Sequence, residues 1–172
     1  MSKILKTRIK PNYITQMYIP EEILQETEKH LRFHGTQGNE GMVFWGGQIR
    51  NDNEAWIKSC IHPEQKTSFL SVDIPLDELP KMNVSLNDRR EFLFAQIHSH
   101  PFEAFHSAID DNYPITFKPG FFSIVVPFFC KERLENLSRC EIWEYKGFGK
   151  WVTLSPDEIE NRFIILKGEM KN

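Results

Sequence analysis

Hydrophobic residues recur along the chain in short runs of strand length, separated by stretches with helical spacing. Strands are expected at residues 15–19, 39–47, 55–61, 67–74, 92–97 and 121–129, and a hairpin at 141–146 and 151–154 around Gly147 and Gly149. Bulky residues on both faces of 39–47 indicate a strand that is buried on both sides. The alternation of strands and helices predicts a single α/β or α+β sandwich on a mixed sheet.

Three helices are predicted from their start signals and spacing. Pro20, followed by two glutamates, begins the first, and Gly35 and Gly38 are expected to end it. Residues 84–91 predict a second helix after a turn at 75–80. The third is expected to begin with Ser155 as N-cap, Pro156 at the first position and Glu158 at the third, and to continue through Leu166 as a buried face.

Composition places the chain among ordinary globular proteins. Its 172 residues are 40% hydrophobic and 26% charged. This length and composition fit a single domain over residues 1–172, with its core at about 15–166. The net charge of −3 argues against nucleic acid or an anionic membrane as the main partner. We expect neither a membrane span nor a signal peptide, because no run of 18 apolar residues exists and the N-terminus lacks the apolar core of a signal peptide.

The three cysteines, Cys60, Cys130 and Cys140, are widely spaced and form no CxxC pair. Each lies within or beside a hydrophobic run, which favours buried thiols in a reducing compartment over a disulfide framework. A catalytic cysteine remains the alternative. We therefore expect a cytoplasmic protein without disulfides.

Residues 96–111 carry the candidate chemistry. His98 and His100 end a hydrophobic run, and Asp110 and Asp111 follow a short distance further on. Two imidazoles and one carboxylate suit zinc and leave a fourth position for water, as in catalytic sites. Bound zinc lowers the pKa of such a water toward about 7. An HxH pair also fits a turn with solvated imidazoles, so the motif alone has low specificity.

A hydrolase with this metal site also needs a proton-transfer group and an oxyanion donor. Glu40 is a candidate base at the start of a predicted strand, although this position also fits a charge at a loop edge. Ser107 is a candidate donor, since a helix that begins there would present Ser107 and Asp110 from its first turn.

In combination, these residues resemble the signature of the JAMM/MPN+ metalloprotease family, which consists of a Glu, an HxHP and an SxxD. The chain has Glu40, HSHP at 98–101, and Ser107 three residues before Asp110. The element order over about 15–165 is similar to that fold, and GFFSIVVP at 120–127 looks most like bacterial members. The resemblance implies a single MPN/JAB-like domain, with a mixed β-sheet flanked by helices in a cytidine-deaminase-like sandwich.

The resemblance also implies a role for each residue of the motif. His98, His100 and Asp110 become zinc ligands, Glu40 the general acid/base and Ser107 the oxyanion-stabilising hydroxyl. Six residues separate His100 from Ser107, where the family usually has seven. The SxxD spacing favours Asp110 as the third ligand, whereas the overall spacing from the histidines would select Asp111.

The activity that the resemblance implies is hydrolysis of a peptide or isopeptide bond at the C-terminus of a ubiquitin-like protein. The partners would be that modifier or its conjugates, and activating- and conjugating-enzyme-like proteins of the same system. Two other readings stay open. One is a small-substrate zinc amidase with the same site, and the other is a catalytically silent MPN-type scaffold.

Overall fold

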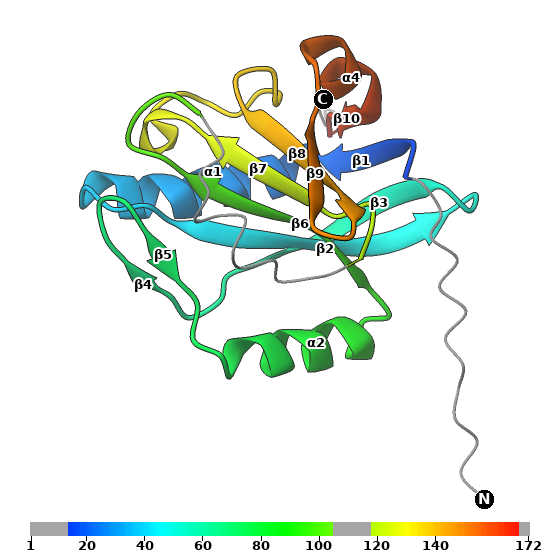
Figure 1. Cartoon of the computed structure of the whole chain (residues 1–172), viewed down its shortest axis with the longest axis horizontal. Helices are drawn as coiled ribbons and strands as arrows, with labels where there is room; N and C mark the ends of the chain where they lie inside the picture. Colours follow the sequence, from blue (N-terminus) through cyan, green and yellow to red (C-terminus); the bar gives the residue numbers. More distant parts are fainter. Residues whose placement is uncertain (1–13, 105–117, 169–172) are drawn as a thin grey trace, which may run out of the picture.

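The computed structural model describes residues 14–104 and 118–168 of the chain. Figure 1 shows a curved sheet with helices packed around it. In chain order the elements are β1 (Gln16–Pro20), α1 (Glu21–Thr36), β2 (Met42–Arg50), β3 (Glu54–Ile61), β4 (Lys66–Thr67), β5 (Val72–Asp73), α2 (Glu78–Asp88), β6 (Phe92–Ser99), β7 (Phe122–Val126), the short turn η1 (Phe128–Cys130), β8 (Glu141–Gly147), β9 (Lys150–Thr153), α4 (Pro156–Arg162) and β10 (Phe163–Leu166).

The main sheet is mixed, as predicted, with the strand order β10-β1-β3-β2-β6-β7-β8-β9. β1 pairs parallel with both β10 and β3, and β6 pairs parallel with β7. The other pairs, β2 with β3, β2 with β6, β7 with β8 and β8 with β9, are antiparallel. The predicted hairpin is the β8–β9 pair. The centre of the sheet is therefore formed by β2 and β6, which carry Glu40 and the two histidines at their ends.

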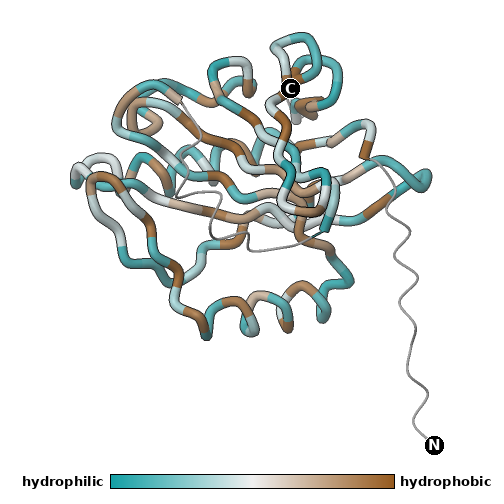
Figure 2. Tube along the Cα trace, viewed as in Figure 1, coloured by the Kyte–Doolittle hydropathy of each residue, from teal (hydrophilic) through white to brown (hydrophobic). Residues whose placement is uncertain are grey.

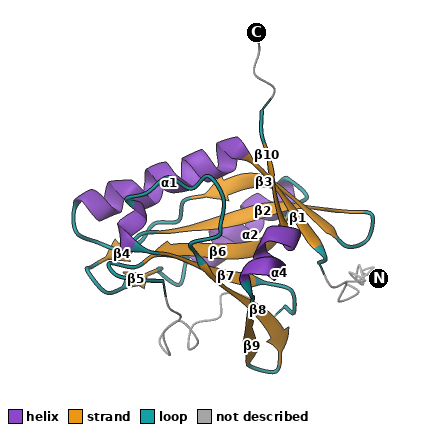
Figure 3. Ribbon diagram, turned by 90° about the horizontal axis from the view of Figure 1, so that it is seen from above, coloured by secondary structure: helices purple, strands orange, loops and turns teal. Residues whose placement is uncertain are grey.

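The two longer helices cover opposite faces of this sheet. Alternate residues of β2 separate cleanly: Val43 and Trp45 belong to the core that includes α1, and Met42 and Phe44 to the core that includes α2. This period of two is what the sequence pattern of a strand buried on both sides predicted. Seen from above in Figure 3, α1 runs alongside the strands and α2 lies behind β2 and β6.

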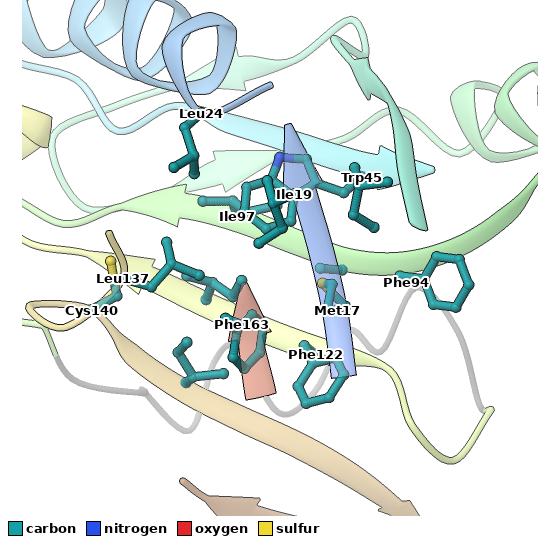
Figure 4. Packing of buried hydrophobic residues seen from close by; sticks show 14 of the residues in the cluster. Met17, Ile19, Leu24, Trp45, Phe94, Ile97, Phe122, Leu137, Cys140 and Phe163 are labelled. Carbon is teal, nitrogen blue, oxygen red and sulfur yellow. The ribbon is translucent and has the colours of Figure 1, made fainter. Parts of the chain in front are cut away.

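The larger core lies between α1 and the sheet and contains most of the bulky side chains. Figure 4 shows Leu24 of α1 near Ile97 and Ile19, with Phe122 and Phe163 further along the same face. Trp45 and Ile97 are fully buried. Figure 2 shows the hydrophobic residues along the central strands and on one side of α2, with hydrophilic residues on the outer loops. Burial of a large side chain contributes roughly 1.5–3 kcal/mol, so this face anchors the strands that carry the candidate site.

The C-terminal elements confirm one local prediction and correct another. Ser155 accepts from the Glu158 N–H at 3.3 Å, and the Glu158 carboxylate accepts from the Ser155 N–H at 2.8 Å, which completes the predicted capping box. The predicted continuation of the helix through Leu166 is wrong. The helix ends at Arg162, and residues 163–166 form β10, which pairs parallel with β1.

Two other boundaries differ from the prediction. Residues 75–80 were expected to form a turn, but α2 already begins at Glu78. Pro80 is accommodated because it lies in the first helical turn, where its missing N–H would have no intrahelical partner. The single strand expected at 67–74 is instead the small β4–β5 hairpin, closed by the Ser68 N–H on the Ser71 carbonyl at 2.9 Å. Within the described residues, no helix is both long and apolar enough to span a membrane.

The Gly46–Gly47 pair in β2 allows an unusually close approach between strands. The register of β2 against β3 shifts between these two residues. A Cβ added to Gly47 would lie 2.2 Å from the Trp56 carbonyl oxygen, which is backbone and cannot move aside easily. The absence of a side chain is therefore a requirement of this β2–β3 contact.

We predict that Gly47→Ala lowers the free energy of unfolding by about 1–3 kcal/mol, because the added methyl group forces β2 and β3 apart. Urea denaturation followed by circular dichroism measures this change. The matched control is Gly168→Ala, whose added Cβ would lie 3.4 Å from a flexible Glu22 side chain. It should stay within about 0.5 kcal/mol of the wild type. Equal stability of the two variants would contradict the prediction.

Candidate metal centre

The two histidines of the HSHP motif lie where β6 ends and point their outer ring nitrogens at each other. The Nε2 atoms of His98 and His100 are 3.1 Å apart, and both side chains are buried. The strand predicted at 92–97 extends to Ser99, so His98 is its penultimate residue and His100 follows directly. A rigid central strand therefore supports both imidazoles.

The pairing between β2 and β6 brings Glu40 to these histidines. Met42 lies directly opposite His98 in the antiparallel register. Residues two apart on a strand share a face, so the continuation of this register places Glu40 opposite His100. The side chains meet accordingly, with Glu40 Oε1 4.0 Å from His100 Nε2 and both groups buried. Glu40 is thus a buried carboxylate at the histidine pair and not a solvated charge at a loop edge.

Ser99 lies between the two histidines and extends the β2–β6 hydrogen bonding beyond the Met42–His98 pair. Its N–H donates to the Gly41 carbonyl at 3.0 Å, and its side-chain oxygen accepts from the Gly41 N–H at 3.0 Å. Ser99 is fully buried. The residue before Met42 is therefore tied to the residue after His98 by two hydrogen bonds. Sequence reasoning did not single out Ser99, because a serine between two histidines carries no pattern of its own.

Gln65 hydrogen-bonds to the other edge of β2 at Met42, where β2 no longer pairs with β3. Its side-chain oxygen accepts from the Met42 N–H at 2.9 Å, and its amide nitrogen donates to the Met42 carbonyl at 2.9 Å. The Glu40 N–H donates to the Ser68 carbonyl at 2.8 Å, in the loop of the β4–β5 hairpin. The backbone on both sides of Gly41 is thereby held from outside the sheet. No sequence signal marked Gln65 for this role.

On its other side, His100 is held by β7 and the turn η1. The His100 N–H donates to the Val126 carbonyl at 2.9 Å, and the His100 carbonyl accepts from the Phe129 N–H at 2.7 Å. Phe128, Phe129 and Cys130 have φ values of 54°, 53° and 56°, in the left-handed region. Each such residue costs about 1–2 kcal/mol. The strained turn is compensated by its contacts to the backbone that follows β6.

The C-terminal end of α1 packs directly on this turn. A Cβ added to Gly35 would meet Phe129 at 2.6 Å, and Arg32 Nε donates to the Cys130 carbonyl at 3.1 Å. Burial raises the pKa of the Cys130 and Cys140 thiols to about 12. Both groups therefore stay protonated at neutral pH, which does not suit a catalytic nucleophile.

The geometry of the histidine pair fits a bound metal ion. Two nitrogen ligands of a tetrahedral zinc, each about 2.0–2.1 Å from the ion, lie about 3.3 Å apart. The observed separation of 3.1 Å is close to this value. His98 and His100 would hold the ion, and the buried Glu40 carboxylate lies 4.0 Å from His100 Nε2. The chemistry of this donor set agrees with zinc and with other cations of similar softness.

Comparisons with known proteins indicate what kind of protein this is. No protein-family model matches the chain. A curated protein from Sinorhizobium fredii (strain NBRC 101917 / NGR234), named "Probable metalloprotease y4jG", is 38% identical over 118 residues, which span 66% of this chain and 72% of the relative. The chain belongs to the JAMM/MPN family of metalloproteases. This membership supports a metal-dependent hydrolase.

One solved structure shows the same type of fold at low sequence identity. Protein DSY2949 from Desulfitobacterium hafniense superposes with a TM-score of 0.60 at 16% identity, over 89% of this chain and 94% of the other. AF2198 from Archaeoglobus fulgidus, a JAB1/MPN domain protein, has a TM-score of 0.49 at 12% identity, over 88% of this chain and 99% of the other.

Three residues of the JAMM/MPN signature are thus brought together by the fold: Glu40, His98 and His100. Ser107 and the two candidates for the third ligand, Asp110 and Asp111, lie outside the described residues. Their roles remain predictions from the motif.

We predict that Ser99→Ala destabilises the protein by about 1–3 kcal/mol, because the buried Gly41 N–H loses its acceptor. Denaturant unfolding of the metal-free protein measures the change. Ser138→Ala is the control, since the Ser138 hydroxyl also makes a short hydrogen bond, 2.6 Å to Asn136, but at an exposed position. That variant should stay within about 0.5 kcal/mol of the wild type. An unchanged midpoint for Ser99→Ala would show that the hydroxyl does not hold Gly41.

Proposed function

We propose that this protein is a zinc-dependent peptidase or isopeptidase that cleaves at the C-terminus of a ubiquitin-like modifier, in deconjugation or in precursor processing. The observation that carries the proposal is the buried Glu40 carboxylate, 4.0 Å from the Nε2 atom of His100 in a pair of converging imidazoles. A carboxylate in this place has a proton-transfer role available to it. A catalytically silent scaffold would gain nothing from a buried acid at this position, because burial of a charged group lowers stability.

In the proposed reaction, Glu40 transfers the protons and Ser107 stabilises the developing negative charge. When bound, the metal ion supplies an acidified water and a Lewis acid for the scissile carbonyl. Glu40 takes a proton from the attacking water while the oxygen of this water bonds to the carbonyl carbon. The protonated Glu40 then donates this proton to the leaving amine as the carbon–nitrogen bond breaks. The hydroxyl of Ser107, as the motif implies, would donate a hydrogen bond to the developing oxyanion.

The surroundings of the site favour a polypeptide over a small polar substrate. Phe69 and Phe102 are 48% and 56% exposed, and their rings pack edge to face with centroids 5.8 Å apart. Both lie beside the centre, because Phe69 follows the residue that accepts from the Glu40 N–H and Phe102 is two residues past His100. Exposed aromatic side chains at the rim suit the apolar residues of an extended chain. An extended tail can also add to a strand edge, where backbone hydrogen bonds supply affinity.

The proposed activity is tested with fusions of candidate modifiers from the same source to a reporter peptide, with and without chelator, by mass spectrometry. We expect cleavage directly after the modifier's C-terminal residue, loss of cleavage with chelator and recovery with added zinc. Cleavage that resists the chelator would contradict the metal-dependent mechanism. Hydrolysis of small amides alone would show that the substrate is not a modifier.

We predict that Glu40→Gln keeps the metal content of the wild type and lowers kcat by about 10²–10⁴-fold, since Glu40 transfers a proton but is not a ligand. Metal analysis and the fusion assay measure the two quantities on the same samples. Glu103→Gln removes an exposed acid three residues after His100 and should leave the metal content and kcat unchanged. Loss of metal in Glu40→Gln would make Glu40 a ligand and overturn its role.

The choice of third ligand gives a separate prediction. Asp110→Asn should lose most of the bound zinc and Asp111→Asn should retain it, because the SxxD spacing selects Asp110. His98→Ala is the positive control for loss of the ion. If Asp111→Asn loses the metal and Asp110→Asn does not, the shortened loop has shifted the ligand by one residue. Equal retention in both variants would exclude both aspartates as ligands.

A further inference from the structure

A second group of metal-ligating side chains lies between α1 and the end of β3. Glu26 comes from α1, Cys60 is in β3, and His62 follows that strand. The Nε2 atom of His62 is 3.3 Å from Glu26 Oε1 and 3.4 Å from Cys60 Sγ. All three ligand atoms lie within 4.8 Å of one another. β3 and β6 flank β2 on opposite edges, so this group is distinct from the histidine pair at the end of β6.

Two of the three distances among these atoms match the first coordination shell of a tetrahedral ion. With zinc–sulfur distances of about 2.3 Å and zinc–nitrogen or zinc–oxygen distances of about 2.0–2.2 Å, neighbouring ligand atoms lie about 3.3–3.6 Å apart. The two contacts to His62 fall in this range. One sulfur, one nitrogen and one carboxylate oxygen form a donor set that suits zinc and other cations of borderline softness.

The Nε2 atom of His62 faces the Glu26 carboxylate and the Cys60 thiol at the same time. The Nε2 atom of a neutral histidine either donates one hydrogen or accepts one, so it cannot donate to Glu26 and accept from the Cys60 thiol together. Burial first, and then the nearby Glu26 carboxylate, raise the pKa of Cys60 to about 12.

The ligands are carried by rigid parts of the fold. Cys60 lies opposite Trp45 in the β2–β3 register, and the Trp45 indole N–H donates to the Thr27 hydroxyl at 2.9 Å. The Thr27 oxygen is 3.5 Å from Cys60 Sγ. Its hydrogen, now donated to the Ile23 carbonyl, can rotate toward a thiolate and stabilise it. The side chains of Glu26 and His62 are 48% and 37% exposed, which leaves a path for an ion from solvent.

His30, one turn further along α1, supports the imidazole of His62. The two rings lie with centroids 4.4 Å apart. His30 Nε2 is 3.1 Å from the amide nitrogen of Gln65, whose side chain also binds the backbone of Met42. An ion at His62 would therefore be connected, through His30 and Gln65, to the start of β2 beside Glu40.

We propose that Glu26, Cys60 and His62 form a second metal site, for zinc or a cation of similar softness, that clamps α1 to the end of β3. This site is independent of the proposed hydrolytic function. Three protein ligands hold the ion, and solvent completes its coordination. The main effect of the bound ion is to stabilise the packing of α1 on the sheet.

Cobalt tests the proposal, because a thiolate ligand gives Co²⁺ a charge-transfer absorption in the near ultraviolet. The ligands proposed for the hydrolytic site contain no sulfur, so this band reports only on a cysteine site. We expect the double variant His98→Ala/His100→Ala to develop the band, saturating at one equivalent of Co²⁺. Cys60→Ser in this background should abolish it. Cys130→Ala, which removes a buried thiol elsewhere, should retain it, with folding of each variant checked by circular dichroism.

Thermal unfolding gives a second readout in the same variants. Zinc at about 100 times its Kd should raise the Tm of the His98→Ala/His100→Ala protein by about 5–10 °C, and Cys60→Ser should remove this shift. A protein without the charge-transfer band, a band that persists in Cys60→Ser, or binding that never saturates would each overturn the second site. None of these outcomes bears on cleavage of modifier fusions, so the two proposals fail separately.

Discussion

The candidate site depends on the antiparallel register between β2 and β6. Met42 opposite His98 fixes the faces of both strands, and the continued pairing of Gly41 with Ser99 carries the register beyond the last strand residues. A slip by one residue would turn Glu40 to the other face and leave a buried histidine pair without its carboxylate. The packing of alternate β2 residues into two separate cores prevents such a slip, because it would place Trp45 and Phe44 in the wrong cores.

The backbone around the site is held more firmly than a strand end normally is. Gln65 pairs with Met42 where β3 has diverged, and the left-handed turn η1 binds the carbonyl of His100. Such a turn is locally unfavourable and persists because α1 and the C-terminal end of β7 surround it. A metal centre benefits from this arrangement, since ligands that are already in place lose little entropy when the ion binds.

Features decided by neighbouring residues were predicted well from the sequence. The capping box at Ser155, the hairpin around Gly147 and Gly149, and the start of α1 at Pro20 all depend on contacts within a few residues. The errors have a different origin. Residues 163–166 continue a helical hydrophobic pattern, but pairing with β1, nearly 150 residues earlier, makes them a strand. Likewise, the small β4–β5 hairpin is held in position by the hydrogen bond from the Glu40 N–H to the Ser68 carbonyl.

By itself, the sequence determined the residue types of the candidate ligands, the place of the two histidines at a strand end and the family signature, because these depend on residue identity and spacing. The tertiary structure alone decided that Glu40 is buried against His100, since that contact requires two strands from distant parts of the chain to pair in one register. It also decided that Glu26, Cys60 and His62 converge. No spacing along the chain links a helix to the end of β3, and only packing of α1 on the sheet brings those atoms within reach of one ion.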